Sequence, residues 1–253
     1  MVLKFFLLAV TLLFISCADF ERDNPEDQRS NKYVANQLPS SPSGEISSSS
    51  RPSSSSITIY SSSSSVNPIG ACPNAVTSSN NTMSCGGQTY KTVKIGDQVW
   101  MAENMNYDVE GSKCYDDDPA NCVTYGRLYS WRTAMVVCPS GWYLPSDDID
   151  WLKLMQYVEN DNGCWSCAGK YLKAKNGWYN NGNGEDKYDF SALPGGRGLS
   201  GGSFDFVGST SYWWTGDENT GGAYYRNMSF NNNIIGYNTF DKSSLQSVRC
   251  VKD

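Results

Sequence analysis

Nine cysteines constrain the fold of this 253-residue chain more than any other feature of its sequence. Cys17 stands alone near the amino terminus, and the other eight are spread between Cys72 and Cys250. An even set of cysteines in an exported chain is expected to form disulfide bonds. The sequence therefore predicts a domain that is cross-linked by disulfides.

Eight cysteines can be paired in about a hundred different ways, and their spacing favours one of these pairings. Two pairs flank short polar loops and one pair lies within a Cys-Trp-Ser-Cys segment, which leaves two residues for a long-range bond. The predicted pairs are Cys72–Cys85, Cys114–Cys122, Cys164–Cys167 and Cys138–Cys250.

The Cys164–Cys167 spacing also occurs in redox dithiols and in half of a zinc site. Zinc needs two further ligands, but the chain has neither a histidine nor a second C-x-x-C segment. A redox motif needs a strand before it and a helix after it, whereas Gly163 and Gly169 indicate a loop. We therefore interpret this pair as structural and predict no metal site.

Residues 1–17 are predicted to form an export signal. Met1–Lys4 is short and basic, and the apolar run from Phe5 to Ile15 is too short to span a bilayer. The following Cys17 resembles the cysteine of a bacterial lipobox, which becomes the lipidated amino terminus of the mature protein. We expect acyl chains on Cys17 to anchor the chain at the outer membrane or cell surface. An ordinary secretory signal that happens to end at a cysteine is the alternative.

Residues 18–70 are predicted to form a disordered, serine-rich linker. Serine fills 16 of the 26 positions from Ser40 to Ser65, and such a segment buries too little apolar area to offset its ordering entropy. Residues 71–253 remain as one globular domain, displayed away from its anchor.

The net charge of the chain disfavours nucleic acid as a partner, and the absence of histidine disfavours several kinds of catalysis. A net charge of −6 disfavours nucleic acid, because an acidic chain repels phosphate. The absence of histidine removes every Ser-His or Cys-His nucleophile pair and the commonest general base. We expect a protein that is not an enzyme and that uses no cofactor.

Hydrophobic periodicity predicts the elements of the first half of the domain. Alternation over residues 88–101 predicts a hairpin that turns at Gly96-Asp97. Apolar spacing predicts a helix over residues 125–137 and a second helix capped by Ser146. The residues that the second helix is expected to bury are Ile149, Leu152, Met155 and Tyr157 or Val158.

The second half of the domain is predicted to form short strands. They cover residues 208–215, 223–230, 234–240 and 246–251. Polar turns at Asn231–Asn233 and Asp241–Ser244 separate the later ones. Two short helices followed by small antiparallel sheets predict a loop-rich α+β domain.

Several segments then share one resemblance. Their residue ranges are 93–107 (VKIGDQVWMAENMNY), 114–122, 125–131, 138–146 and 247–251 (SVRCV). In this order they resemble the Fibrobacter succinogenes major paralogous domain family. That family is related in fold to C-type-lectin-like and formylglycine-generating-enzyme-like domains, so the resemblance implies a C-type-lectin-like fold. It also implies the Cys138–Cys250 bond, but no activity, because the calcium motifs of sugar-binding lectins and the catalytic cysteines of the enzymes have no counterpart here.

A group of aromatic and polar residues in the second half is the candidate ligand site. Its members are Trp213, Trp214, Asp217, Asn219, Tyr224 and Tyr225. Aromatic rings can stack on sugar faces, while Asp and Asn bind hydroxyl groups. Packing in the core is the competing interpretation, because adjacent residues of a strand point to opposite faces. The acidic loop Asp116–Asp118 lacks the ligand spacing of an EF-hand, so we expect a solvated loop there instead of a calcium site.

Together these features predict a cell-envelope lipoprotein that displays a non-catalytic binding or adhesion module for a polysaccharide or an envelope protein. One alternative is a carboxylate-dependent glycoside hydrolase, which needs two carboxyl groups roughly 5–9.5 Å apart across a cleft. The other is a structural envelope protein without a small ligand.

Mass spectrometry of protein isolated from its native membrane tests the export prediction. We expect a chain that begins at an acylated Cys17 and that contains no free thiol. An intact Met1 together with reduced cysteines would contradict the prediction.

Overall fold

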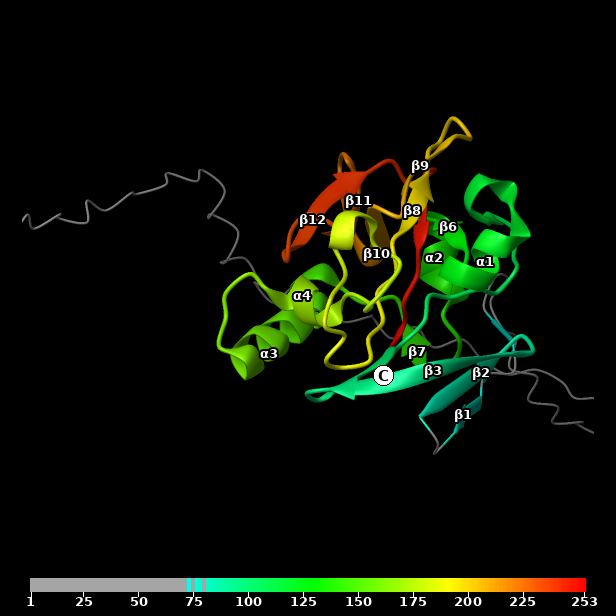
Figure 1. Ribbon diagram of the computed structural model, residues 1–253. Helices are drawn as coiled ribbons and strands as arrows, with labels where there is room; N and C mark the ends of the chain where they lie inside the picture. The colour runs from blue at the N-terminus through cyan, green and yellow to red at the C-terminus, as the bar shows by residue number, and fades with distance from the viewer. Residues whose placement is uncertain (1–71, 74–75, 79–80) are drawn as a thin grey trace, which may run out of the picture. The chain divides into compact units, whose positions relative to one another are not determined.

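The computed structural model describes residues 72–73, 76–78 and 81–253 (Figure 1). The predicted signal peptide, Cys17 and nearly all of the serine-rich linker lie outside these residues. The described part is mostly β-sheet with few short helices, which confirms a mixed α and β architecture.

The first sheet has six strands in the order β1-β2-β3-β4-β14-β7. Their bounds are Val76–Ser78, Thr82–Cys85, Gln88–Ile95, Gln98–Met101, Val251–Lys252 and Trp142–Tyr143. The predicted hairpin is β3–β4, and it turns through Gly96 at a φ of 59° that glycine adopts without strain. Strand β14 pairs antiparallel with both β4 and β7, so the end of the chain completes this sheet.

The second sheet has eight strands, in the order β12-β11-β10-β8-β13-β6-β5 with β9 paired to β8. In chain order, β5, β6 and β8 to β13 are Ser112–Lys113, Leu128–Ser130, Gly195–Gly198, Phe204–Val207, Thr210–Asn219, Gly222–Ser229, Ile235–Phe240 and Leu245–Ser247. Strand β10 runs parallel to β8 and β13, so the sheet is larger and less uniformly antiparallel than predicted. The predicted strand over residues 246–251 is split, because β13 and β14 belong to different sheets.

The residues that the structure describes also form four α-helices and three short helical turns. The helices α1 to α4 are Pro119–Tyr125, Trp131–Val137, Leu152–Asn162 and Ala168–Leu172. The turns η1 to η3 are Tyr115–Asp117, Asp147–Trp151 and Tyr179–Asn181. Within the described part of the chain, no helix has the length and apolar character needed to cross a membrane.

The helix predicted over residues 125–137 is wrong in its first half. Leu128–Ser130 forms β6 and pairs with β13, and the Ser130 side chain then caps α2. The predicted cap at Ser146 is confirmed, since its hydroxyl accepts the Asp150 N–H at 3.3 Å. The tertiary sheet pairing of β6 overrides the helical spacing of its apolar residues.

The buried face predicted for the second helix is partly confirmed, because Val158 is fully buried and Met155 packs against the core, but it is wrong at its start. Ile149 and Leu152 are 69% and 41% exposed, whereas Trp151 and Leu154 are fully buried. The helix begins with the π-helical turn η2, and Trp151 packs against Trp100 with ring centroids 5.1 Å apart. This aromatic contact determines which face of the helix turns inward.

Two hydrophobic cores lie on opposite faces of β10. Trp213 belongs to the core that includes Trp100 and residues of α3 and α4, while Trp214 belongs to the core that includes Tyr129 and residues of α2. Figure 1 shows the corresponding helices on opposite sides of the second sheet. Adjacent strand residues point to opposite faces, and here both faces are covered.

The described residues form four disulfide bonds, in the pairs predicted from the spacing. Their Cα–Cα distances are 5.8, 5.0, 5.9 and 6.1 Å for Cys72–Cys85, Cys114–Cys122, Cys138–Cys250 and Cys164–Cys167. All four lie within the range that a disulfide requires. Cys138–Cys250 spans 112 residues and ties the end of α2 to the residue before β14.

Removal of single disulfides tests the dependence of stability on loop length. We expect C138A/C250A to lower the free energy of unfolding by about 5 kcal/mol and C114A/C122A by about 2.5 kcal/mol. The reason is that removing the bond that closes the longer loop gives the unfolded chain the larger gain in conformational entropy. Urea unfolding of the full chain measures both values. Equal losses would contradict the expectation.

Candidate ligand-binding groove

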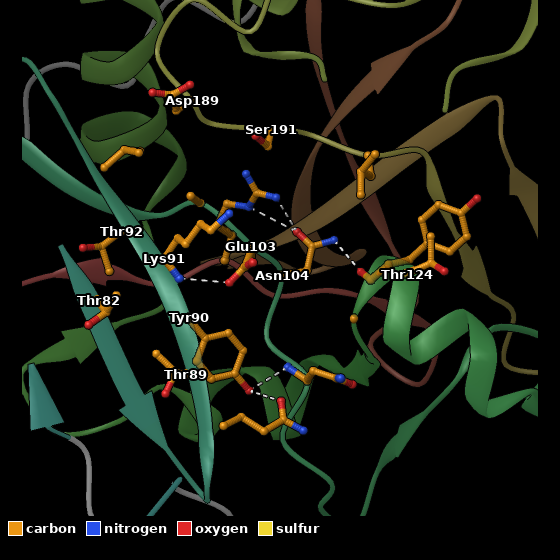
Figure 2. A pocket seen from close by; sticks show the side chains of 18 of the residues that line it. Thr82, Thr89, Tyr90, Lys91, Thr92, Glu103, Asn104, Thr124, Asp189 and Ser191 are labelled. Atoms are coloured by element: carbon orange, nitrogen blue, oxygen red, sulfur yellow. Dashed lines mark hydrogen bonds between the residues drawn. The ribbon is translucent and has the colours of Figure 1, made fainter. Parts of the chain in front are cut away.

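A groove of about 870 Å³ lies where segments distant in the sequence meet. One wall comes from β2 and β3, and the other comes from the end of α1 and the loop at residues 189–193. Residues 102–106, which follow β4, lie between them (Figure 2).

Most side chains that line the groove end in polar groups. The hydroxyl groups belong to Thr82, Thr89, Tyr90, Thr92, Thr124, Tyr125 and Ser191, the amides to Asn81, Gln88, Asn104 and Asn106, and the carboxyl groups to Glu103 and Asp189. Several of these groups, among them Gln88, Thr89 and Asp189, are exposed. Such a lining suits a ligand that presents many hydroxyl groups.

The wall formed by β3 is held by hydrogen bonds to the segment after β4. The Lys91 N–H donates to the Glu103 carboxylate at 2.9 Å, and the Asn106 N–H donates to the Tyr90 hydroxyl at 3.1 Å. Tyr90 in turn donates to Gln88 Oε1 at 2.9 Å, and burial raises the pKa of its phenol. Figure 2 shows these bonds along the wall.

Asn104 is the centre of the groove floor and is only 7% exposed. Its Oδ1 accepts hydrogen bonds from Trp213 Nε1 at 2.9 Å and from Arg249 Nε and Nη2 at 3.1 and 2.9 Å. Its Nδ2 donates to the Tyr125 carbonyl at 2.9 Å and to Ser247 Oγ at 3.3 Å. One amide therefore connects the first sheet, the second sheet and α1.

Gly126 permits this close approach. A Cβ at this position would lie 2.8 Å from Asn104 Cβ and 2.9 Å from the Met105 carbonyl, and its φ is 77°. Only glycine combines that conformation with that space.

Arg249 lies at the floor with 1% of its surface exposed. Besides its bonds to Asn104, its Nη1 donates to the Phe190 carbonyl, and its guanidinium lies 4.3 Å from the centre of the Phe190 ring. Burial lowers the pKa of Arg249 to about 9, against a weaker opposing effect of Asp186 and Glu103. The group stays charged at neutral pH.

The loop that ends the second wall has a strained backbone. Asp186, Asp189 and Ser191 have φ values of 44°, 54° and 53°. The Asp186 carboxylate accepts both the N–H and the hydroxyl of Ser191 at 2.7 Å, while Phe190 is fully buried. The loop is thereby fixed with Asp189 exposed at the groove, and strain of this kind is common at binding sites.

The predicted aromatic site is wrong for three of its residues. Trp213 and Trp214 are fully buried and Tyr225 is 9% exposed. The indole N–H groups donate to Asn104 and, at 2.8 Å, to the Tyr129 carbonyl. Both faces of β10 are covered, so the ring that alternation would direct outward meets a second core.

The other predicted residues remain near the surface but do not line the groove. Asp217 accepts the Asp147 N–H at 2.5 Å. Asn219 donates to the Tyr224 hydroxyl at 3.2 Å. These contacts stabilise the β10–β11 hairpin and its junction with η2, and they do not form a cavity with the two tryptophans.

The acidic segments have local roles. Asp118 accepts the Ala120 N–H at 2.9 Å at the start of α1, and Asp147 forms a buried ion pair with Arg226 at 2.5 Å. In the described ranges, no three Asp, Glu, Cys or His residues are grouped so that they could hold a metal ion.

Sequence reasoning missed every residue of the groove floor. One signal was available, because Arg249 interrupts the apolar run Val248 to Val251, where a charged side chain must find polar partners if it is buried. Its partners Asn104 and Phe190 lie 145 and 59 residues away, beyond the reach of local pattern.

An alanine substitution tests the importance of Asn104. We expect Asn104→Ala to lower the free energy of unfolding by about 2–4 kcal/mol, because it leaves buried donors of Trp213 and Arg249 without an acceptor. Asn106→Ala, whose side chain makes no hydrogen bond to described residues, should change it by less than about 1 kcal/mol. Urea unfolding measures both, and similar losses would contradict the role of Asn104.

Comparison with known proteins identifies the family. No curated protein and no solved structure matches the chain. Residues 93–252 match the family described as the Fibrobacter succinogenes major domain. The matched range covers more than half of the chain and includes the floor residues Asn104 and Arg249 and their partner Trp213. The chain therefore belongs to the Fibrobacter succinogenes major domain family.

Proposed function

We propose that this protein is a non-catalytic binding module of the cell envelope and that its groove binds a polysaccharide. The observation that carries the proposal is an open groove with a rigid floor and a lining of hydroxyl, amide and carboxyl groups. A sugar chain offers hydroxyl groups that both donate and accept hydrogen bonds, which matches such a lining.

Rigidity of the walls supports the proposal. Cys122 lines the groove and is joined to Cys114, and the Cys72–Cys85 bond holds the end of β2 in the opposite wall. A preorganised site loses little conformational entropy when it binds. This matters for glycans, whose individual contacts are weak.

The finer parts of the account belong to the same proposal. A C-type-lectin-like fold is supported by the Cys138–Cys250 bond, which joins the segment before Gly141-Trp142 to the last strand. Display at the outer membrane or cell surface through lipid on Cys17 is supported by the sequence of residues 1–17 and the serine-rich linker. Neither nucleic acid nor a cofactor has a role in this account.

The glycoside hydrolase remains a second candidate because Glu103 and Asp189 line the same groove. A hydrolase would require one of them as general acid and the other as base or nucleophile. An envelope protein is the other partner class that the groove could hold, and it is an outcome of the binding experiment.

Binding of polysaccharides to the purified full chain tests the proposal. We expect retention of the chain on at least one plant or envelope polysaccharide at micromolar concentration. Glu103→Ala should weaken that binding about tenfold, because it removes a charged acceptor. Glu110→Ala, at another exposed glutamate outside the groove, is the matched control. No retention on any polysaccharide, or capture of an envelope protein alone, would contradict the proposal.

The same samples separate binding from hydrolysis. A binding module leaves the polysaccharide chain length unchanged after long incubation. Release of reducing ends that is lost in Glu103→Gln or Asp189→Asn would establish the hydrolase instead.

A further inference from the structure

Arg249 differs from the other shielded arginines of the described residues in having no acidic partner. Arg127, Arg197 and Arg226 pair with carboxylates at 2.5, 3.0 and 2.5 Å. Arg249 is more deeply buried than any of them, yet no carboxylate of the described part of the chain lies within 4.0 Å of it. A buried charge without a direct ion pair is costly, and the more distant Asp186 and Glu103 offset only part of that cost, so its presence at a groove floor needs an explanation.

The guanidinium also has unused donors. It carries five N–H groups, and it makes three hydrogen bonds, two to Asn104 and one to the Phe190 carbonyl. Two N–H groups, one on each Nη atom, therefore have no acceptor among the described residues. Because Arg249 reaches the groove, a ligand can supply that acceptor.

We infer that the groove binds a glycan that carries a carboxylate, a uronic acid, and that this carboxylate accepts hydrogen bonds from Arg249. The inference rests on the proposed function, because it names the chemistry of the sugar held in the same groove. A carboxylate matches the planar donors of a guanidinium, and it supplies the direct ionic partner that Arg249 lacks among the described residues.

The other charges of the groove are compatible with this ligand. Glu103 and Asp189 are exposed at the walls, where water and salt screen their repulsion, and Lys91 is an exposed cation on the β3 wall. The two wall carboxylates accept sugar hydroxyls beside the bound acid. A uronic acid offers both kinds of group.

A matched pair of ligands tests the inference without altering the protein. Trigalacturonate and its methyl ester differ only at the carboxyl group, in its charge, its acceptor strength and the added methyl group. Calorimetry with the full chain should give a dissociation constant about tenfold lower for the acid than for the ester. The preference should change less than about threefold between 0.15 and 0.5 M salt, roughly the range over which exposed charges lose most of their influence.

Conservative substitutions test whether Arg249 causes the preference for the acid over the ester. Arg249→Lys keeps the charge but loses the planar donors, so we expect the preference for the acid to fall below about threefold. Arg197→Lys, at an arginine that pairs with Asp205 outside the groove, is the control and should keep the preference. If Arg249→Lys does not fold, the ligand pair on the unaltered chain still decides.

Equal affinity for acid and ester would overturn this inference and leave the polysaccharide groove intact. Binding of neither trisaccharide, while a neutral polysaccharide binds, would also overturn it. Binding of acidic peptides in place of any sugar would overturn both this inference and the proposed function.

Discussion

The hydrogen-bonded group of Asn104, Trp213 and Arg249 is the constraint on which the rest of the domain depends. Asn104 follows the last strand of the predicted hairpin, Trp213 lies on the central strand of the second sheet, and Arg249 lies where the chain crosses between sheets. One carbonyl oxygen, Asn104 Oδ1, accepts three hydrogen bonds from the other two side chains. Leaving any of these buried donors unpaired would cost free energy. The arrangement of the two sheets that keeps all three hydrogen bonds is therefore favoured.

The same arrangement explains why the groove is polar although the chain is rich in aromatic residues. Helices and loops cover both faces of β10, so the tryptophans Trp100, Trp151, Trp213 and Trp214 all lie in cores. The groove forms away from these cores, where loop ends and a sheet edge meet, and it is lined by short polar side chains. If the groove binds the proposed glycan, recognition depends mainly on hydrogen bonds to these polar groups. The aromatic rings in the groove lining are those of Tyr90, which is buried, and Tyr125, which is partly exposed.

Local chemistry made part of the fold predictable. The hairpin, the Ser146 cap and the disulfides of short loops depend on residues close in sequence, and the spacing of the cysteines left few choices for the last bond. The inward turn of Trp151 before α3 and the position of the groove were not predictable in this way. Trp151 turns inward because it packs against Trp100 of the first sheet. The groove floor joins Asn104 and Arg249, which lie 145 positions apart in the sequence. In β10, the sequence pattern did not show that both faces of the strand are covered by hydrophobic cores.

The most direct test of the account is an NMR measurement of the side-chain N–H groups of Arg249 and Trp213 in the full chain. Both donate to the same buried oxygen, so both signals should exchange slowly with solvent in the free protein. On addition of a uronic acid oligosaccharide, the Arg249 Nε–H signal should shift while the Trp213 indole signal stays protected. Rapid exchange of both N–H groups, or an Arg249 signal that does not move at saturation, would contradict the central claim that this network forms the floor of a binding site.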